Sequence, residues 1–233
     1  MDLLSQHEAF LRAIFDAPDD DTPRLVYADF IQENGEEERA VFIRWQCGIG
    51  PRPTVVPDFT EVFAFDRGFP IPWKTVTLAS DELSDSTELR RKLIGPWAPC
   101  FAVEGVKVCG GRITSAEPFD TLFGLAAFAR VTELNLEGNE VEEEKAVDSL
   151  FTPFRLEPVI TTAGVETLAQ HRGVRKITSL NLTNNNLDND AARALVKSPY
   201  LDNLKRLQLL EGNRLRGRVW QQVIERFGED VVG

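Results

Sequence analysis

Histidine is the residue on which most nucleophilic catalysis depends, and this chain has two, His7 and His171. A Ser-His-Asp or Cys-His site would need one of them beside a nucleophile. His7 falls in the first turn of an amphipathic segment and His171 in the polar stretch AQHRGVRK, and neither adjoins a recognisable nucleophile motif. The sequence therefore predicts no catalytic histidine.

Metal and phosphate motifs are the next possibility. Cys47, Cys100 and Cys109 show no C-x-x-C spacing and no common zinc spacing, so buried, inert thiols are expected. The run Asp19–Asp21 does not fit the EF-hand frame and is expected to be a loop and a helix cap. CGGR at 109–112 is not followed by the G-K-[ST] of a P-loop. We expect neither a metal nor a cofactor.

Carboxylates are concentrated in EGNEVEEEKAVD, residues 137–148, which we expect to form the solvated face of a helix. Two carboxylates at a suitable separation can hydrolyse glycosidic bonds. No pair is singled out by the sequence, and a carboxylate-dependent hydrolase is therefore kept as an alternative function.

The composition is that of a soluble globular protein. Of 233 residues, 42% are hydrophobic and 27% charged, enough for one large domain or two small ones. No apolar stretch approaches the roughly 18 residues of a membrane span, and no secretory signal is recognisable. Three cysteines are too few for a disulfide framework, so a cytoplasmic location is expected. The net charge of -11 argues against nucleic-acid binding.

That charge is unevenly distributed along the chain. Residues 1–47 carry eleven Asp and Glu against four Arg, whereas residues 196–220 carry six Lys and Arg against two acids. These runs are either ordinary solvated faces or a device that steers partners or stacks copies head to tail.

A repeated pattern, L-x-x-L-x-L-x-x-N-x-L, organises the second half of the chain. It occurs in residues 131–141 and 177–187, in looser form in 204–215 with one extra residue before the Asn, and in degenerate form in 103–113. The equivalent positions Val106, Leu134, Leu180 and Leu207 are 28, 46 and 27 residues apart. Two of these intervals match leucine-rich repeats of about 20–29 residues. The long interval indicates an insertion near residues 142–162.

The pattern predicts one strand, an Asn-stabilised turn and a returning helix in each copy. We expect parallel strands on a concave side and helices on a convex side, because no copy can bury its apolar face alone. An earlier degenerate strand is expected around Val76 and Leu78. Residues 219–227, ended by Gly228, predict a closing helix. The fold class is therefore α/β.

The non-leucine strand positions would line the concave side and are the candidate partner-binding residues. They are Lys107, Glu133, Asn135, Glu137, Ser179, Asn181, Thr183, Arg206 and Gln208, accompanied by Gly105 and Cys109.

The first 47 residues are helical by periodicity. Ser5 and Glu8 predict a capping box for a first helix. Asp21 predicts the cap of a second helix, with Leu25, Val26, Ala28, Phe30 and Ile31 buried. A third helix is expected from about Glu36 to Gln46, with Val41, Phe42 and Trp45 inward, and three such helices pack as a small bundle.

The run EAFLRAIFDAPDDDTPRLVYADFIQENGEEERAVFIRWQC resembles the repeat-companion domain, an N-terminal module of planctomycete and some other bacterial proteins. Phe30 and Ile31 stand where that family usually has Trp and Leu. DRGFP, GPWAP and the closing segment are similar to the regions that join such modules to leucine-rich repeats of the ribonuclease-inhibitor-like type. The resemblance implies a fold but no enzymatic activity.

We therefore expect three regions: a helical module at 1–47, a joining segment at 48–100 that can include a degenerate first repeat, and leucine-rich repeats with their cap at 101–233. The expected function is a non-enzymatic scaffold or adaptor that binds a protein partner, with no nucleic acid and no membrane. The sequence defines neither that partner nor the oligomeric state. In a second hypothesis, the acidic N-terminal module makes the contacts and the repeats act as a rigid spacer.

Overall fold

A computed structural model describes residues 2–54, 65–66, 68–70, 75–85, 87, 89, 103–125, 128–142 and 154–233. These residues form two compact units, each described by itself. The first comprises Met1–Thr75, Ser86–Glu104 and Phe123–Arg130; the second comprises Val76–Asp85, Gly105–Leu122 and Val131–Gly233. The three-region division of the sequence stays a prediction, and Cys100 lies outside the described residues.

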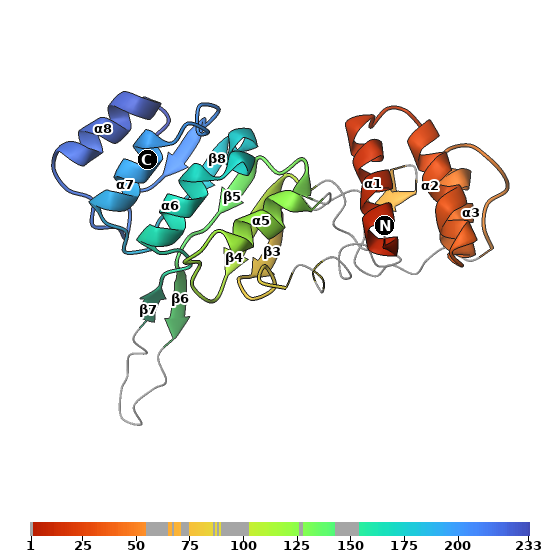
Figure 1. Cartoon of the computed structure of the whole chain (residues 1–233), viewed down its shortest axis with the longest axis horizontal. Helices are drawn as coiled ribbons and strands as arrows, with labels where there is room; N and C mark the ends of the chain where they lie inside the picture. Colours follow the sequence, from red (N-terminus) through yellow and green to blue (C-terminus); the bar gives the residue numbers. More distant parts are fainter. Residues whose placement is uncertain are drawn as a thin grey trace, which may run out of the picture. The chain divides into compact units, whose positions relative to one another are not determined.

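The first unit is built on three helices, α1 (Leu3–Asp16), α2 (Thr22–Glu33) and α3 (Glu37–Gln46) (Figure 1). Their shared core consists of Leu11, Ile14, Tyr27, Ala28, Ile31, Ala40 and Ile43. The cap of α1 is Asp2 rather than the predicted Ser5, because the Asp2 carboxylate accepts the Ser5 N–H at 2.8 Å. The predicted three-helix arrangement is confirmed, and the predicted capping box is wrong.

The buried face of α2 agrees with the predicted one at Ala28 and Ile31 but not at Val26. Val26 is 47% exposed, whereas Tyr27 is fully buried and Arg24 nearly so. In α3, Arg39 is buried and its guanidinium lies 5.4 Å from the centre of the Tyr27 ring. Helix α2 therefore buries Tyr27 together with two cationic neighbours, Arg24 and Arg39, whereas the sequence predicts a run of apolar residues on this side.

A short hairpin packs against the end of α3. Strands β1 (Phe65–Asp66) and β2 (Phe69–Pro70) pair antiparallel, and the Gly68 N–H donates to the Gln46 side chain at 2.8 Å. Gly68 has φ of +86°, and a Cβ there would lie 2.5 Å from the Ile43 Cα. Only glycine satisfies both conditions.

The second unit contains a five-stranded parallel sheet in the order β3-β4-β5-β8-β9. The strands are β3 (Thr75–Ala79), β4 (Gly105–Cys109), β5 (Glu133–Asn135), β8 (Ser179–Asn181) and β9 (Arg206–Gln208). Residues Val106, Leu134, Leu180 and Leu207 lie side by side on successive strands and are buried. The predicted alignment of these four positions is therefore confirmed, and so is the strand expected around Val76 and Leu78.

Helices connect the strands and follow one another along the sheet (Figure 1). They are α5 (Glu117–Gly124), α6 (Thr162–Gln170), the 3-10 turn η2 (Arg172–Lys176), α7 (Asn189–Lys197) and α8 (Arg218–Phe227). As expected from the sequence, α8 ends at Gly228, whose φ is +98°, and buries Val219 and Val223. Trp220, the third residue of α8, is half-buried.

After α8 the chain returns to the sheet. The Leu207 N–H donates to the Val231 carbonyl at 2.8 Å, and the Gly233 N–H donates to the Leu207 carbonyl at 2.9 Å. The last residues therefore cover the edge of β9, a position that would otherwise leave backbone groups unpaired.

The acidic segment after β5 is not helical where the structure describes it. Residues Asn139–Glu142 form β6, which pairs antiparallel with β7 (Phe154–Glu157). The prediction of a solvated helix is therefore wrong for residues 139–142. The antiparallel partner lies beyond the range of local sequence periodicity, and residues 143–153 lie outside the described residues.

Candidate functional site

We define the polar face of the sheet by the nine candidate residues, seven of which lie in two rows across the strands. Gly105, Glu133, Ser179 and Arg206 share one register, and Lys107, Asn135, Asn181 and Gln208 share the next. Successive side chains on a strand point to opposite sides, so these residues project away from the buried leucines. The structure thus brings together the strand residues that the sequence predicted.

Part of this face is occupied by its own hydrogen bonds. The Asn135 side-chain oxygen accepts the Glu137 N–H at 2.9 Å, and the Asn181 oxygen accepts the N–H and hydroxyl of Thr183 at 3.0 and 2.8 Å. The Asn181 amide donates to one carboxylate oxygen of Glu137 at 3.4 Å, and the Asn184 amide donates to the other Glu137 oxygen at 3.3 Å. These hydrogen bonds stabilise the turns at the strand ends. Four of the predicted residues therefore have a structural role: Asn135, Glu137, Asn181 and Thr183.

The remaining predicted residues are open to a ligand. Among the residues that the structure describes, no hydrogen bond or ion pair engages the side chains of Lys107, Glu133, Ser179, Arg206 or Gln208. Glu133, Arg206 and Gln208 are exposed, and Lys107 and Ser179 are half-buried.

One exposed apolar residue was missed by the sequence analysis. Leu210 follows Gln208 by two residues and is 47% exposed, whereas Leu209 between them is fully buried. Strand alternation continued past β9 was the signal that would have found it.

Two asparagines that follow the strands hold the turns together. The Asn185 side chain is buried, and its oxygen accepts the N–H groups of Val159 and Ile160 at 2.7 and 3.0 Å. Its amide nitrogen is directed at three carbonyl oxygens, those of Leu136, Leu182 and Thr183, at 2.6 to 3.1 Å.

Asn213 repeats this arrangement one strand later. Its oxygen accepts the N–H groups of Asn185 and Leu187, and its amide nitrogen is within bonding distance of the carbonyls of Leu182 and Leu209. The role predicted for the Asn position is confirmed at both residues. Asn139, the corresponding residue of the preceding copy, instead lies in β6.

His171 belongs to the same unit and both of its ring nitrogens are engaged. Nδ1 accepts the Gly173 N–H at 2.9 Å, and Nε2 therefore carries the proton and donates to the Asp120 carboxylate at 3.1 Å. The His171–Asp120 contact connects the end of α6 to α5.

His7 lies in a buried polar cluster of the first unit. Its Nδ1 is 3.0 Å from the Tyr27 hydroxyl, and Arg39 pairs with Glu36 at 3.2 Å beside them. Burial lowers the pKa of His7, with Arg39 adding to that effect and Glu36 opposing it. Burial also raises the pKa of Tyr27 to about 12. At neutral pH the imidazole is therefore uncharged, so its 4.0 Å approach to Glu36 is not an ion pair.

The two described cysteines, Cys47 and Cys109, are free thiols, and Cys109 donates to the Leu78 carbonyl at 3.5 Å. Within the described ranges, no three His, Cys, Asp or Glu side chains gather closely enough to hold a metal ion. In the same part of the chain, no helix combines the length and apolar character needed to cross a bilayer.

The chain matches no protein-family model and no curated protein. What the structure defines is a mixed α/β protein with a parallel sheet that exposes a polar face.

Proposed function

We propose that the second unit is a short leucine-rich repeat solenoid of the ribonuclease-inhibitor-like type, preceded by a helical module of the repeat-companion kind. The protein acts as a non-enzymatic adaptor that binds a protein partner through the polar face of the sheet. The aligned leucines and the two asparagine turns support the first statement. The uncommitted side chains on β4, β5, β8 and β9 support the second and carry the proposal.

The width of this face favours a macromolecular partner. Lys107 and Gln208 occupy one register on strands three spacings apart, which is about 14 Å at roughly 4.8 Å per spacing. A partner that contacts both ends must span that width, as a segment of polypeptide does.

The charges on the face favour a partner of mixed charge. Lys107 and Arg206 are cationic and Glu133 between them is anionic, so a uniformly anionic polymer would meet repulsion at the centre. Complementary charges at such exposed positions contribute mainly to partner choice and association rate.

A test compares two full-length variants, each with four alanines, as baits in cell lysate. The first changes Lys107, Glu133, Arg206 and Gln208, and the control changes Lys197, Glu166, Arg172 and Gln170, which are exposed residues of the same four types on the helices. We expect a partner that the control retains and the first variant loses, with affinity then measured on purified proteins. Asn135 and Asn181 are left intact because their loss would disturb the turns.

A third bait distinguishes binding at the sheet from the alternative hypothesis that the acidic N-terminal module makes the contacts. It neutralises the exposed carboxylates of Glu33, Glu37 and Glu38 to glutamine. Loss of the partner from this bait alone would contradict binding at the sheet and favour the N-terminal module. Substrate turnover abolished by carboxylate changes would instead favour the hydrolase alternative.

A further inference from the structure

A cavity of about 320 Å³ lies where strands of the parallel sheet end and helices begin. Its lining includes Arg112, Thr161, Thr162, Ala163, Asp188 and Arg214. These residues come from the segments that follow β4, β7, β8 and β9, so one hollow collects side chains far apart in the sequence. Ligands of parallel α/β sheets commonly bind at this end of the strands.

The two arginines extend from backbone that is held in place. Ile113, next to Arg112, donates its N–H to the Val159 carbonyl at 2.8 Å, and the Arg214 N–H donates to the Leu187 carbonyl at 2.7 Å. Among the described residues, neither guanidinium takes part in an ion pair. Two exposed cationic groups thus border one hollow from separate loops.

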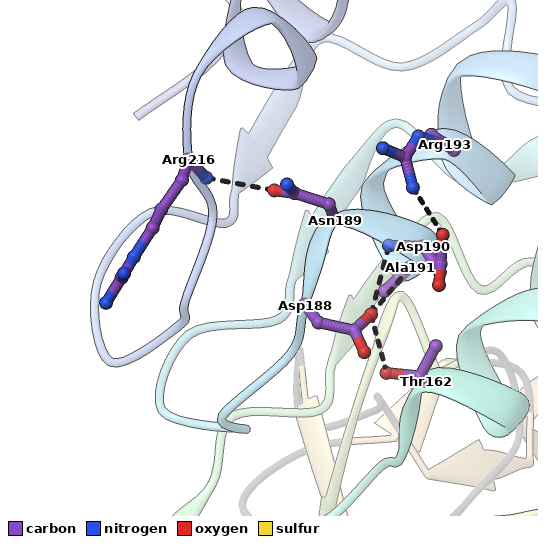
Figure 2. Close-up of polar contacts among 7 residues, drawn as sticks. All are labelled: Thr162, Asp188, Asn189, Asp190, Ala191, Arg193 and Arg216. Carbon is purple, nitrogen blue, oxygen red and sulfur yellow. Dashed lines mark hydrogen bonds and ion pairs between the residues drawn. The ribbon is translucent and has the colours of Figure 1, made fainter.

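The single carboxylate in the lining, that of Asp188, is held through one of its two oxygens. One Asp188 oxygen accepts the Thr162 hydroxyl and the N–H groups of Asp190 and Ala191, at 3.0 to 3.3 Å (Figure 2). Asp188 therefore caps α7 and offsets the positive end of that helix. By contrast, α6 has the neutral cap Thr161 and no acid in its first turn.

The α6 end also supplies hydrogen-bond donors. Thr162 and Ala163 are in the cavity lining, and their N–H groups donate to no acceptor within the described chain, whereas the Gly164 N–H donates to the Thr161 hydroxyl oxygen. The residues that line the hollow therefore carry two guanidinium groups and one pair of N–H groups without acceptors in the described chain.

We propose that this cavity binds the phosphate group of a small phosphomonoester. A tetrahedral phosphate presents three terminal oxygens to donors on different sides, whereas a planar carboxylate presents two. Guanidinium forks match phosphate oxygens in geometry and charge. The volume is that of a small-molecule site. This site is independent of the polar face of the sheet and of the function proposed for it.

The test is an amide NMR titration of the full-length protein with inorganic phosphate and with phenyl phosphate, at ionic strength held constant with sodium chloride. We expect saturable shifts of the Thr162 and Ala163 amides with both probes. Arg112→Gln and Arg214→Gln should each weaken binding about tenfold or more, as expected for charge-assisted hydrogen bonds. Arg216→Gln is the matched control, because its side chain points away from Asp188 and Thr162 (Figure 2).

Three results would overturn the proposal. One is the absence of saturable shifts at these two amides. A second is equal weakening by Arg216→Gln, which would indicate general attraction to the basic loop 214–218. The third is benzoate binding as tightly as phenyl phosphate, which would remove the preference for phosphate. Circular dichroism of each variant confirms that the exposed substitutions leave the fold intact.

Discussion

Replacing Asn185 by alanine is the sharpest test of how the sheet unit is held together. The side-chain oxygen accepts two backbone N–H groups, and the two amide hydrogens are directed at three backbone carbonyl oxygens, all of them buried. Alanine would leave two N–H groups, those of Val159 and Ile160, without acceptors. An unsatisfied buried donor costs about 1–3 kcal/mol, so for two such donors we expect a loss of about 2–6 kcal/mol in the free energy of unfolding. That is a large fraction of a typical domain's stability.

Asn185→Asp keeps the side-chain acceptor and removes the side-chain donor, so it tests the two roles of Asn185 separately. The aspartate retains an oxygen for the two N–H groups but turns a second oxygen toward three carbonyl groups. Burial and these carbonyls should raise the pKa of the new carboxyl in the folded state. A raised folded pKa means that stability is present at low pH and is lost as pH rises. The variant should therefore become more stable as pH falls from neutral into the acid range, a dependence that Asn185→Ala, which adds no titratable group, should not show.

Urea unfolding followed by circular dichroism and amide hydrogen exchange measures both effects. Asn139→Ala is the matched control, since Asn139 occupies the equivalent sequence position but lies in β6, and no hydrogen bond of its side chain occurs among the described residues. We expect that control to change stability by less than about 0.5 kcal/mol. If Asn185→Ala costs no more than Asn139→Ala, the asparagine turns do not hold the unit together.

Three further predictions concern other parts of the chain. Gly164→Ala should lower the free energy of unfolding by about 1–2 kcal/mol despite alanine's helix propensity, because the new Cβ would overlap the Ile113 carbonyl oxygen. Gly124→Ala is the control, since there is open space around Gly124, and it should not destabilise the protein in urea unfolding. Burial lowers the pKa of His7 below 6.5, so the unfolded state takes up the proton first and α1–α3 should lose stability as pH falls below that value. Amide exchange measured against pH should show this slope, and His7→Gln should flatten it. Deleting residues 231–233 should speed amide exchange in β9 selectively, and unchanged exchange would mean that this edge pairing contributes nothing.

The strand alignment could be predicted because burial imposes a periodic pattern on each strand and the same pattern recurs. The asparagine turns were equally visible, since Asn185 and Asn213 each follow a strand at the expected position. The sequence could not distinguish polar side chains that form hydrogen bonds within the fold from polar side chains that remain available to a ligand. Asn181 and Gln208 occupy the same register, but Asn181 is hydrogen-bonded to Glu137 and Thr183 while Gln208 is open. That difference depends on contacts between copies.

In the first unit, the misjudged positions share a physical cause. Val26 was expected inside because it adjoins other apolar residues, but α2 is rotated so that Tyr27 is buried in its place. A buried phenol with a polar partner such as His7 loses no hydrogen bond, and the Arg39 guanidinium packs on its ring. The periodicity of apolar residues does not take these polar and cation–π contacts into account, so it predicts Val26 rather than Tyr27 to be buried.

The irregular spacing of the copies has a structural counterpart. The interval from Leu134 to Leu180 is 46 residues and exceeds its neighbours by 18 and 19. The β6–β7 hairpin runs from Asn139 to Glu157, whose Cα atoms are paired at its base. Immediately after it, Val159 and Ile160 supply the two N–H groups that Asn185 accepts. The chain thus leaves the parallel sheet after β5 and contacts Asn185 again within three residues of the end of β7. The longer interval therefore coincides with this antiparallel pair, and β5 and β8 still pair with Leu134 beside Leu180.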